Sequence, residues 1–259
     1  SYKNDSLKTV GTIAKTPVAT GADLVAYSGW NSSNYMDAVN FNYNFGYPPT
    51  ISIMLWQKIT DISNYSYAMS FSHSNSIKGG ISNGSSGSSY PGQAYFNMGD
   101  ATIYSKIRVD DGEWHCLVGT IEKNSKKFYV DGMLMEAARI SDYDMTTINR
   151  LHVGTYGVNH DYGHKGSIAL LRVSSSVPSE EKIKKMYEDE KHLFKENSKC
   201  TLYGSSNAVK ALEYDDSTEI LYVGTSSGRS DFQGLRRINN NTDAVSTAIS
   251  ANNGFIIEQ

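Results

Sequence analysis

Alternation of large and small residues along the chain predicts strands separated by turns almost to residue 174. In the segment 65–72 (YSYAMSFS) large and small side chains alternate, which predicts a strand with one face in a core and the other near solvent. The segment 50–58 (TISIMLWQK) is apolar on both faces, as in a central strand covered on both sides. The stretch 79–92 (GGISNGSSGSSYPG) offers little to bury and predicts a mobile surface loop or hairpin tip.

A series of hairpins follows in the next block. Asp131-Gly132 is a two-residue turn signal, because this pair tolerates the positive φ angles that a tight hairpin demands. Strands are predicted on both sides of this turn and after it, at 114–121, 127–130, 133–137, 150–155 and 166–174.

Beyond residue 174 the pattern changes once to a helix and then returns to strands. From Pro178 to Phe194, the apolar residues Ile183, Met186 and Tyr187 recur at helical spacing, which predicts one amphipathic helix against the sandwich. Strands at 209–214, 219–225 and 229–238 then predict a small β appendage resembling one propeller blade.

The predicted organisation is an N-terminal linker or extension at 1–21, a β-sandwich with its closing helix at 22–197, and the appendage at 198–259. A sheet of about sixty residues is marginal alone, so the appendage is expected to drive self-association, with a homotrimer favoured. The competing expectation is that it folds back on its own sandwich.

Composition limits the classes of partner that the chain is expected to bind. Charged residues make up 20% of the chain and the net charge is −3, which argues against nucleic acid. No apolar run approaches the roughly 18 residues needed to span a bilayer, so membrane insertion is not expected. Cys116 and Cys200 are interpreted as ordinary thiols rather than as a disulfide.

Four motifs occur in a family's order: 111–115 (DGEWH), 128–132 (FYVDG), 166–173 (GSIALLRV) and the helix start at 178–181 (PSEE). With them, residues 22–195 resemble the laminin-G-like, concanavalin A-like lectin superfamily. The resemblance implies an all-β fold, a concanavalin A-like antiparallel β-sandwich or jelly roll. The segment 221–237 (LYVGTSSGRSDFQGLRR) is similar to C-terminal parts of tail-fibre-like proteins of marine phages, which implies a place on a virion.

The loop 156–164 is the strongest candidate for ligand binding, because it combines aromatic faces for sugar stacking with hydrogen-bonding groups. Trp30, with neighbouring Asn and Tyr residues, is a second and weaker candidate. The alternative for the loop is a long glycine-rich hairpin with incidental polarity. The predicted ligand-binding residues are Tyr156, Asn159, His160, Asp161, Tyr162, His164 and Trp30.

Calcium is the one cofactor considered, since many laminin-G-like domains bind it through loop aspartates. Asp142, Asp144 and Asp161 are the candidate ligands, with ordinary polar loop residues as the alternative. No catalytic residues are predicted. The clustered carboxylates Glu213, Asp215, Asp216 and Glu219 lie outside the sandwich, at a turn, and do not match a glycosidase strand motif.

These patterns favour a non-catalytic recognition module of a phage virion, a tail fibre or appendage, that binds host-surface glycan or protein through loops of the sandwich rim. A purely structural virion component that decorates or cements its neighbours is the alternative, and a glycan-active enzyme is the third. The expected partners are other virion proteins and a host receptor, at the virion surface or otherwise outside the cell.

Overall fold

The computed structural model describes residues 7–39, 41, 43–141, 143–206, 208–244, 249–252 and 255–258. The chain divides into two compact units. The first comprises the described residues of Ser1–Thr16 and Ala26–Tyr187, and the second those of Pro17–Val25 and Glu188–Gln259. Among the described residues, no helix has the length and hydropathy needed to cross a bilayer.

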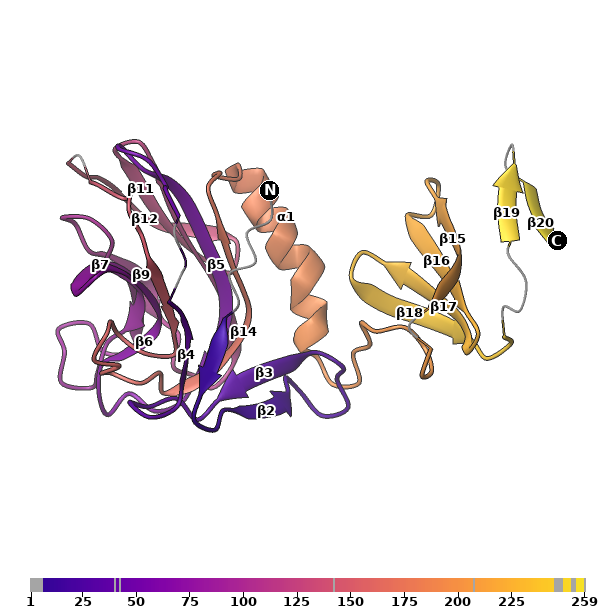
Figure 1. The fold of residues 1–259 in the computed structure, drawn as a ribbon, viewed down its shortest axis with the longest axis horizontal. Coiled ribbons are helices and arrows are strands. Elements are labelled where there is room, and N and C mark those ends of the chain that lie inside the picture. The colour runs from indigo at the N-terminus through magenta and orange to yellow at the C-terminus, as the bar shows by residue number, and fades with distance from the viewer. Residues whose placement is uncertain are drawn as a thin grey trace. The chain divides into compact units, whose positions relative to one another are not determined.

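The first unit is built on two seven-stranded sheets that face each other, as Figure 1 shows. Antiparallel pairing runs from β1 to β9 in one sheet and from β12 to β3 in the other, which confirms the predicted antiparallel sandwich. In spatial order the first sheet consists of β1 (Lys8–Val10), β4 (Tyr35–Ala38), β13 (Arg150–Val153), β6 (Ser66–His73), β7 (Ser76–Asn83), β8 (Gln93–Phe96) and β9 (Ile103–Arg108). The second consists of β12 (Met133–Arg139), β11 (Ser125–Val130), β10 (Trp114–Glu122), β5 (Thr50–Ile59), β14 (Gly166–Ser174), β3 (Val25–Ser28) and β2 (Ala14–Pro17).

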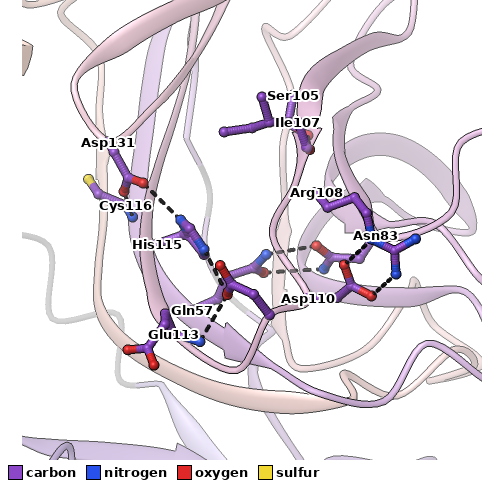
Figure 2. Close-up of polar contacts among 11 residues, drawn as sticks. Gln57, Asn83, Ser105, Ile107, Arg108, Asp110, Glu113, His115, Cys116 and Asp131 are labelled. Carbon is purple, nitrogen blue, oxygen red and sulfur yellow. Dashed lines mark hydrogen bonds and ion pairs between the residues drawn. The ribbon is translucent and has the colours of Figure 1, made fainter.

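The apolar core lies between the sheets and follows the predicted periodicity in β5. Ile51, Ile53 and Leu55 point inward and are fully buried. Gln57 continues this inward row, where its side chain exchanges two hydrogen bonds with Asn83 of the opposite sheet, at 2.7 and 3.2 Å (Figure 2). Each buried amide thereby satisfies the other, so the polar pair is tolerated inside the sandwich.

The prediction that β6 faces solvent on one side is wrong. Tyr67 pairs with Ser82 whereas Met69 pairs with Ile81, so one extra residue is inserted in β6 between them. This bulge reverses the alternation: Met69 enters the core, and Tyr67, two residues earlier, points to the opposite face. Both faces of the strand are therefore largely covered.

The prediction of a loop over 79–92 is also wrong in its first part, because 79–83 belongs to strand β7 and is buried. The glycines there permit close packing. A Cβ at Gly80 would lie 2.0 Å from the carbonyl oxygen of Met69 on the adjacent strand. The non-strand segment is limited to 84–92. Composition alone suggested a loop, but small residues also fit where backbones approach closely.

The segment predicted as an N-terminal extension supplies strands to both sheets. β1 pairs with β4 through Thr9 and Met36, and β2 lies at the edge of the second sheet. These residues are therefore part of the sandwich. Their polar, exposed composition is typical of edge strands and gave no sign of this role.

The predicted amphipathic helix is α1 (Glu180–Glu190), and it continues as a short 3₁₀ helix over Lys191–Phe194. It covers the outer face of the second sheet beside β5 and β14 (Figure 1). There Tyr187 stacks on Trp56, with ring centroids 5.6 Å apart, and Ile183 is buried. Because α1 covers the outer face of β5, this strand is apolar on both of its faces.

The second unit holds the small β appendage. Its four-stranded antiparallel sheet consists of β15 (Val209–Asp215), β16 (Ile220–Thr225), β17 (Gly228–Gln233) and β18 (Arg236–Asn241). The single strand predicted over 229–238 is in fact a hairpin that turns at Gly234, where φ is +58°. A further pair, β19 (Ile249–Asn252) and β20 (Phe255–Glu258), follows.

Candidate functional site

A row of side chains crosses the outer face of the first sheet. Tyr67 of β6, Ser82 of β7, Tyr95 of β8 and Tyr104 of β9 are successive cross-strand partners. Their sequence neighbours Ile81, Ala94, Phe96 and Ile103 point the other way into the core. Because the small Ser82 stands between two tyrosines, the row is low in its middle and high on both sides.

This arrangement forms a depression with a volume of about 390 Å³. Aromatic side chains surround it from three strands, from Tyr65 just before β6 and from the loop that follows β13. The lining residues are Tyr65, Tyr67, Ser82, Tyr95, Asn97, Thr102, Tyr104, Tyr156 and Tyr162. Their side chains carry hydroxyl and amide groups, and none of these nine residues is charged.

The polar groups of the depression are oriented by hydrogen bonds. The backbone N–H of Gly80 donates to Oδ1 of Asn97 at 2.9 Å, which leaves the Asn97 amide nitrogen to donate to the Tyr67 hydroxyl at 2.6 Å. Burial raises the pKa of Tyr67, so this hydroxyl keeps its proton. The hydrogen bond from Asn97 fixes the position of this hydroxyl at the surface of the depression.

The loop 156–162 closes one side of the depression. Tyr156 lies with its ring centroid 4.3 Å from that of Tyr67, and the N–H of Tyr67 donates to the carbonyl of Tyr162 at 3.0 Å. Within the loop, His160 and Tyr162 both have positive φ, at 55° and 49°. Such backbone conformations are costly for residues with a Cβ, and they cluster where a site requires them.

The structure places the predicted binding residues in different surroundings. Tyr156 and Tyr162 line the depression, and Tyr162 is 52% exposed. Asn159 and Asp161 are exposed on the same loop but do not line the depression. His160 is partly exposed and stacks on Tyr35, with ring centroids 3.5 Å apart.

His164 and Trp30 are buried, and their assignment as ligand-binding residues is corrected on that ground. His164 is 2% exposed, and burial lowers its pKa to about 3, so it is a neutral interior side chain. Trp30 is 5% exposed, packs against Gly154 and donates its indole N–H to the carbonyl of Tyr27. Neither side chain can contact a ligand at the surface.

The residues missed by sequence reasoning lie on strands β6 to β9 or directly beside the ends of these strands, rather than in the loop 156–162. They are Tyr65, Tyr67, Ser82, Tyr95, Asn97, Thr102 and Tyr104. The usable signal was a tyrosine at an outward position in each of three strands, but reading it required the strand register. The bulge at Tyr67 hides that register from any alternation pattern.

Two of the three predicted calcium ligands, Asp144 and Asp161, belong to the described residues. Asp142 lies outside the described residues. Asp144 accepts hydrogen bonds from the backbone N–H and the hydroxyl of Thr146, which also lower its pKa. Among the described residues the one group of three potential metal ligands consists of Asp37, His152 and His160, and it includes neither Asp144 nor Asp161.

Of the carboxylates predicted at a turn of the appendage, Asp216 and Glu219 lie in the turn 216–219, whereas Glu213 and Asp215 belong to β15. Asp215 accepts hydrogen bonds from Ser217 and Thr218, and these bonds lower its pKa to about 2. A carboxylate with such a low pKa is ionised at neutral pH and cannot serve as a general acid. Asp215 therefore caps the turn between β15 and β16.

Comparison with known proteins begins with the family. The family model of the concanavalin A-like lectin/glucanases superfamily matches residues 31–184, more than half of the chain. Comparison with curated proteins gives no match.

Several solved structures share the fold at low identity. Domain 4 of AbnA, a GH43 extracellular arabinanase from Geobacillus stearothermophilus, solved in complex with arabinotriose, is 16% identical with a TM-score of 0.52, covering 68% of this chain and 82% of that one. The binding domain of Paraclostridial Mosquitocidal Protein 1 is 10% identical with a TM-score of 0.55, covering 99% and 69%. The binding domain of botulinum neurotoxin serotype D is 13% identical with a TM-score of 0.54, covering 98% and 64%.

Proposed function

Because the chain belongs to the concanavalin A-like lectin/glucanases superfamily, we propose that it is a non-catalytic glycan-recognition module whose binding site is the tyrosine depression. The observation that carries this proposal is the in-register row of Tyr67, Ser82, Tyr95 and Tyr104. Fold alone does not define a function, so the argument rests on the chemistry of this surface.

Stacked tyrosines suit a sugar ring, which presents C–H groups on its faces and hydroxyls around its rim. Tyrosine offers an apolar ring and a polar tip on a stiff side chain, so little entropy is lost on binding. Tyr65, Tyr104 and Tyr162 surround the hollow, while Asn97 and the Tyr67 hydroxyl provide oriented hydrogen-bonding groups. Since no charged side chain lines it, the depression fits a neutral saccharide better than an acidic one.

The same lining supports binding without hydrolysis. Glycoside hydrolysis commonly uses two carboxyl groups on either side of the scissile bond, and the nine lining residues contain none. The solved neighbours include an arabinanase domain in complex with arabinotriose and two toxin binding domains. These names describe those proteins, and they support a binding role for this chain.

The setting proposed for the module is the surface of a phage virion, as part of a tail fibre or appendage, with other virion proteins and a host-surface glycan as partners. This part of the proposal rests on the similarity of the segment 221–237 to tail-fibre-like proteins. A structural decorating or cementing protein is the second candidate. It would need no sugar site, so the tyrosine depression favours recognition.

Binding to a panel of neutral oligosaccharides that includes arabinotriose tests the proposal. Tyr104→Ala, Tyr156→Ala and Tyr162→Ala should each weaken binding roughly 5- to 30-fold, because each removes a stacking surface worth about 1–2 kcal/mol. The matched control is Tyr47→Ala, since Tyr47 is 58% exposed and does not line the depression.

Calorimetry gives the affinities, and a reducing-sugar assay on the same mixtures follows hydrolysis. If the three variants bind like the wild type, the site is elsewhere. Release of reducing ends that depends on one carboxylate would show that the protein is an enzyme. If no saccharide binds while the protein still incorporates into particles, the structural candidate is supported instead.

A further inference from the structure

A second polar cluster lies under the loop that carries Tyr156 and Tyr162. Asp37 of β4, His152 of β13 and His160 of the loop each present one potential ligand atom, and these three atoms lie within 4.8 Å of one another. Asp37 is 6% exposed and His152 is fully buried, whereas His160 is partly exposed. Residues from two adjacent strands and a loop therefore converge on one interior point.

Two atoms at this point make no hydrogen bond. Oδ1 of Asp37 and Nδ1 of His152 lie 3.4 Å apart, and both are buried without a hydrogen-bond partner. Buried polar atoms are rarely left in this state, because each loses its water without replacement. A cation bound between the carboxylate oxygen of Asp37 and the imidazole nitrogen of His152 would satisfy both atoms at once.

The spacing suits a metal ion. Ligand atoms around a tetrahedral zinc ion, with bonds of roughly 2.0–2.2 Å, lie about 3.4 Å apart. The Asp37–His152 distance already has this value, and a small movement of the partly exposed His160 would bring in the third ligand. Two imidazoles and one carboxylate form a donor set that zinc and similar divalent ions prefer.

The surroundings hold the two histidines in place. The Oγ of Ser72 lies 2.9 Å from Nε2 of His152, so this nitrogen is occupied and Nδ1 is left facing Asp37. Histidines that bind metals commonly use their second nitrogen in this way. The Tyr35 ring stacked on His160 fixes the orientation of that imidazole. The positive charge of Arg150 favours the ionised carboxylate of Asp37, which is the form that binds a metal ion.

We propose that Asp37, His152 and His160 bind a zinc-class divalent metal ion, which fastens the loop 156–162 to strands β4 and β13. The third ligand, His160, belongs to this loop, and Tyr156 and Tyr162 of the same loop line the depression. Binding of the ion therefore stabilises the positive-φ conformation of His160 and holds both tyrosines at the site. The proposal concerns metal binding and stands whether or not the depression binds a sugar.

Zn²⁺ titration of the full chain, without a histidine tag and after removal of metals by a chelator, tests the site. We expect one Zn²⁺ per chain, and no competition by Ca²⁺ because calcium prefers six or more oxygen ligands. His160→Gln and His152→Gln should weaken Zn²⁺ binding at least about 100-fold, and Ser72→Ala about 10- to 100-fold. His192→Gln is the control, since His192 does not belong to the cluster.

Hydrogen exchange of the loop provides a readout that a merely structural histidine would not change. Zn²⁺ should slow exchange over 156–162 in the wild type and in His192→Gln, but not in His160→Gln. Because His160 is partly exposed, its variant should fold even if His152→Gln does not. Stoichiometry far below one, or His160→Gln binding Zn²⁺ like the wild type, would overturn the site. Zinc binding without slower loop exchange would overturn the fastening of the loop.

Discussion

The buried Lys126 offers a stability prediction with a definite sign. This side chain lies on β11 and is fully buried. Its ammonium group donates to the carbonyl of Met98 at 2.6 Å and to that of Ala101, and it lies 4.8 Å from the ring centroid of Phe96. Burial lowers the pKa of Lys126 from 10.5 to about 7, with the charges of Asp100 and Glu136 opposing this shift.

The magnitude follows from proton linkage. Between pH 7 and 10.5 the unfolded chain holds a proton on Lys126 that the folded chain has mostly released, so the free energy of unfolding rises with pH over this window. Each pH unit contributes up to about 1.4 kcal/mol. From pH 7 to pH 9.5 the wild type should therefore gain roughly 3 kcal/mol relative to Lys126→Met, which lacks the titrating group.

Urea unfolding followed by tryptophan fluorescence measures this difference, because all three tryptophans, Trp30, Trp56 and Trp114, lie in the sandwich unit. The unfolding free energies of wild type and Lys126→Met are compared at intervals from pH 7 to pH 9.5. Lys15→Met, which alters an exposed lysine, is the control and should keep a constant difference. If the difference for Lys126→Met also stays constant within about 0.5 kcal/mol, Lys126 titrates like an ordinary lysine and the reasoning is wrong.

The remaining predictions concern a histidine and the appendage. Burial alone would lower the pKa of His115, but its hydrogen bonds and charge interactions with Asp131 and Asp111 outweigh burial and raise it above 6.5. The stability from His115 should therefore be complete below pH 6.5 and lost as pH rises through the folded pKa, so unfolding experiments should find His115→Gln more destabilising at pH 5.5 than at pH 8.5. For the appendage we expect a trimer in solution, because Leu212 and Tyr214 of β15 are 65% and 55% exposed. Sedimentation should find the full chain trimeric and Leu212→Glu reduced to monomers, and a monomeric wild type at micromolar concentration would contradict this.

The sandwich could be predicted where the pattern is local. The strand predicted over 166–174 coincides with β14, and the Asp131-Gly132 turn has φ values of +52° and +76° as expected. The helix was equally clear, because Tyr187 stacks on Trp56 and Ile183, one turn earlier, is buried. Periodicity within one element and turn chemistry were sufficient for these features.

Prediction failed where pairing between strands decides the structure. Loop composition drew attention to Tyr156 and Tyr162, which line the depression, but also included His164, whose burial depends on the strands around it. The strand residues of the depression were missed because the bulge between Tyr67 and Met69 reverses which side chains face outward. A surface assembled across four strands depends on register, and a single sequence contains no direct record of register.

The motifs that reveal the family have a structural role, which explains why they did not locate the site. His115 of the DGEWH motif lies between Asp111 and Asp131, bonded to them at 3.1 and 2.8 Å. Figure 2 shows the bond between His115 and Asp131. Asp131 also accepts from the backbone N–H of Cys116 at 2.8 Å, so the two motifs fasten the β10–β11 hairpin to the turn before it. The tyrosines of the depression come from β6 and the residue before it, from β8, from β9 and from the loop after β13, and none belongs to these motifs. Outward tyrosines can therefore change while the frame remains, and ligand preference in this fold must be argued from those positions.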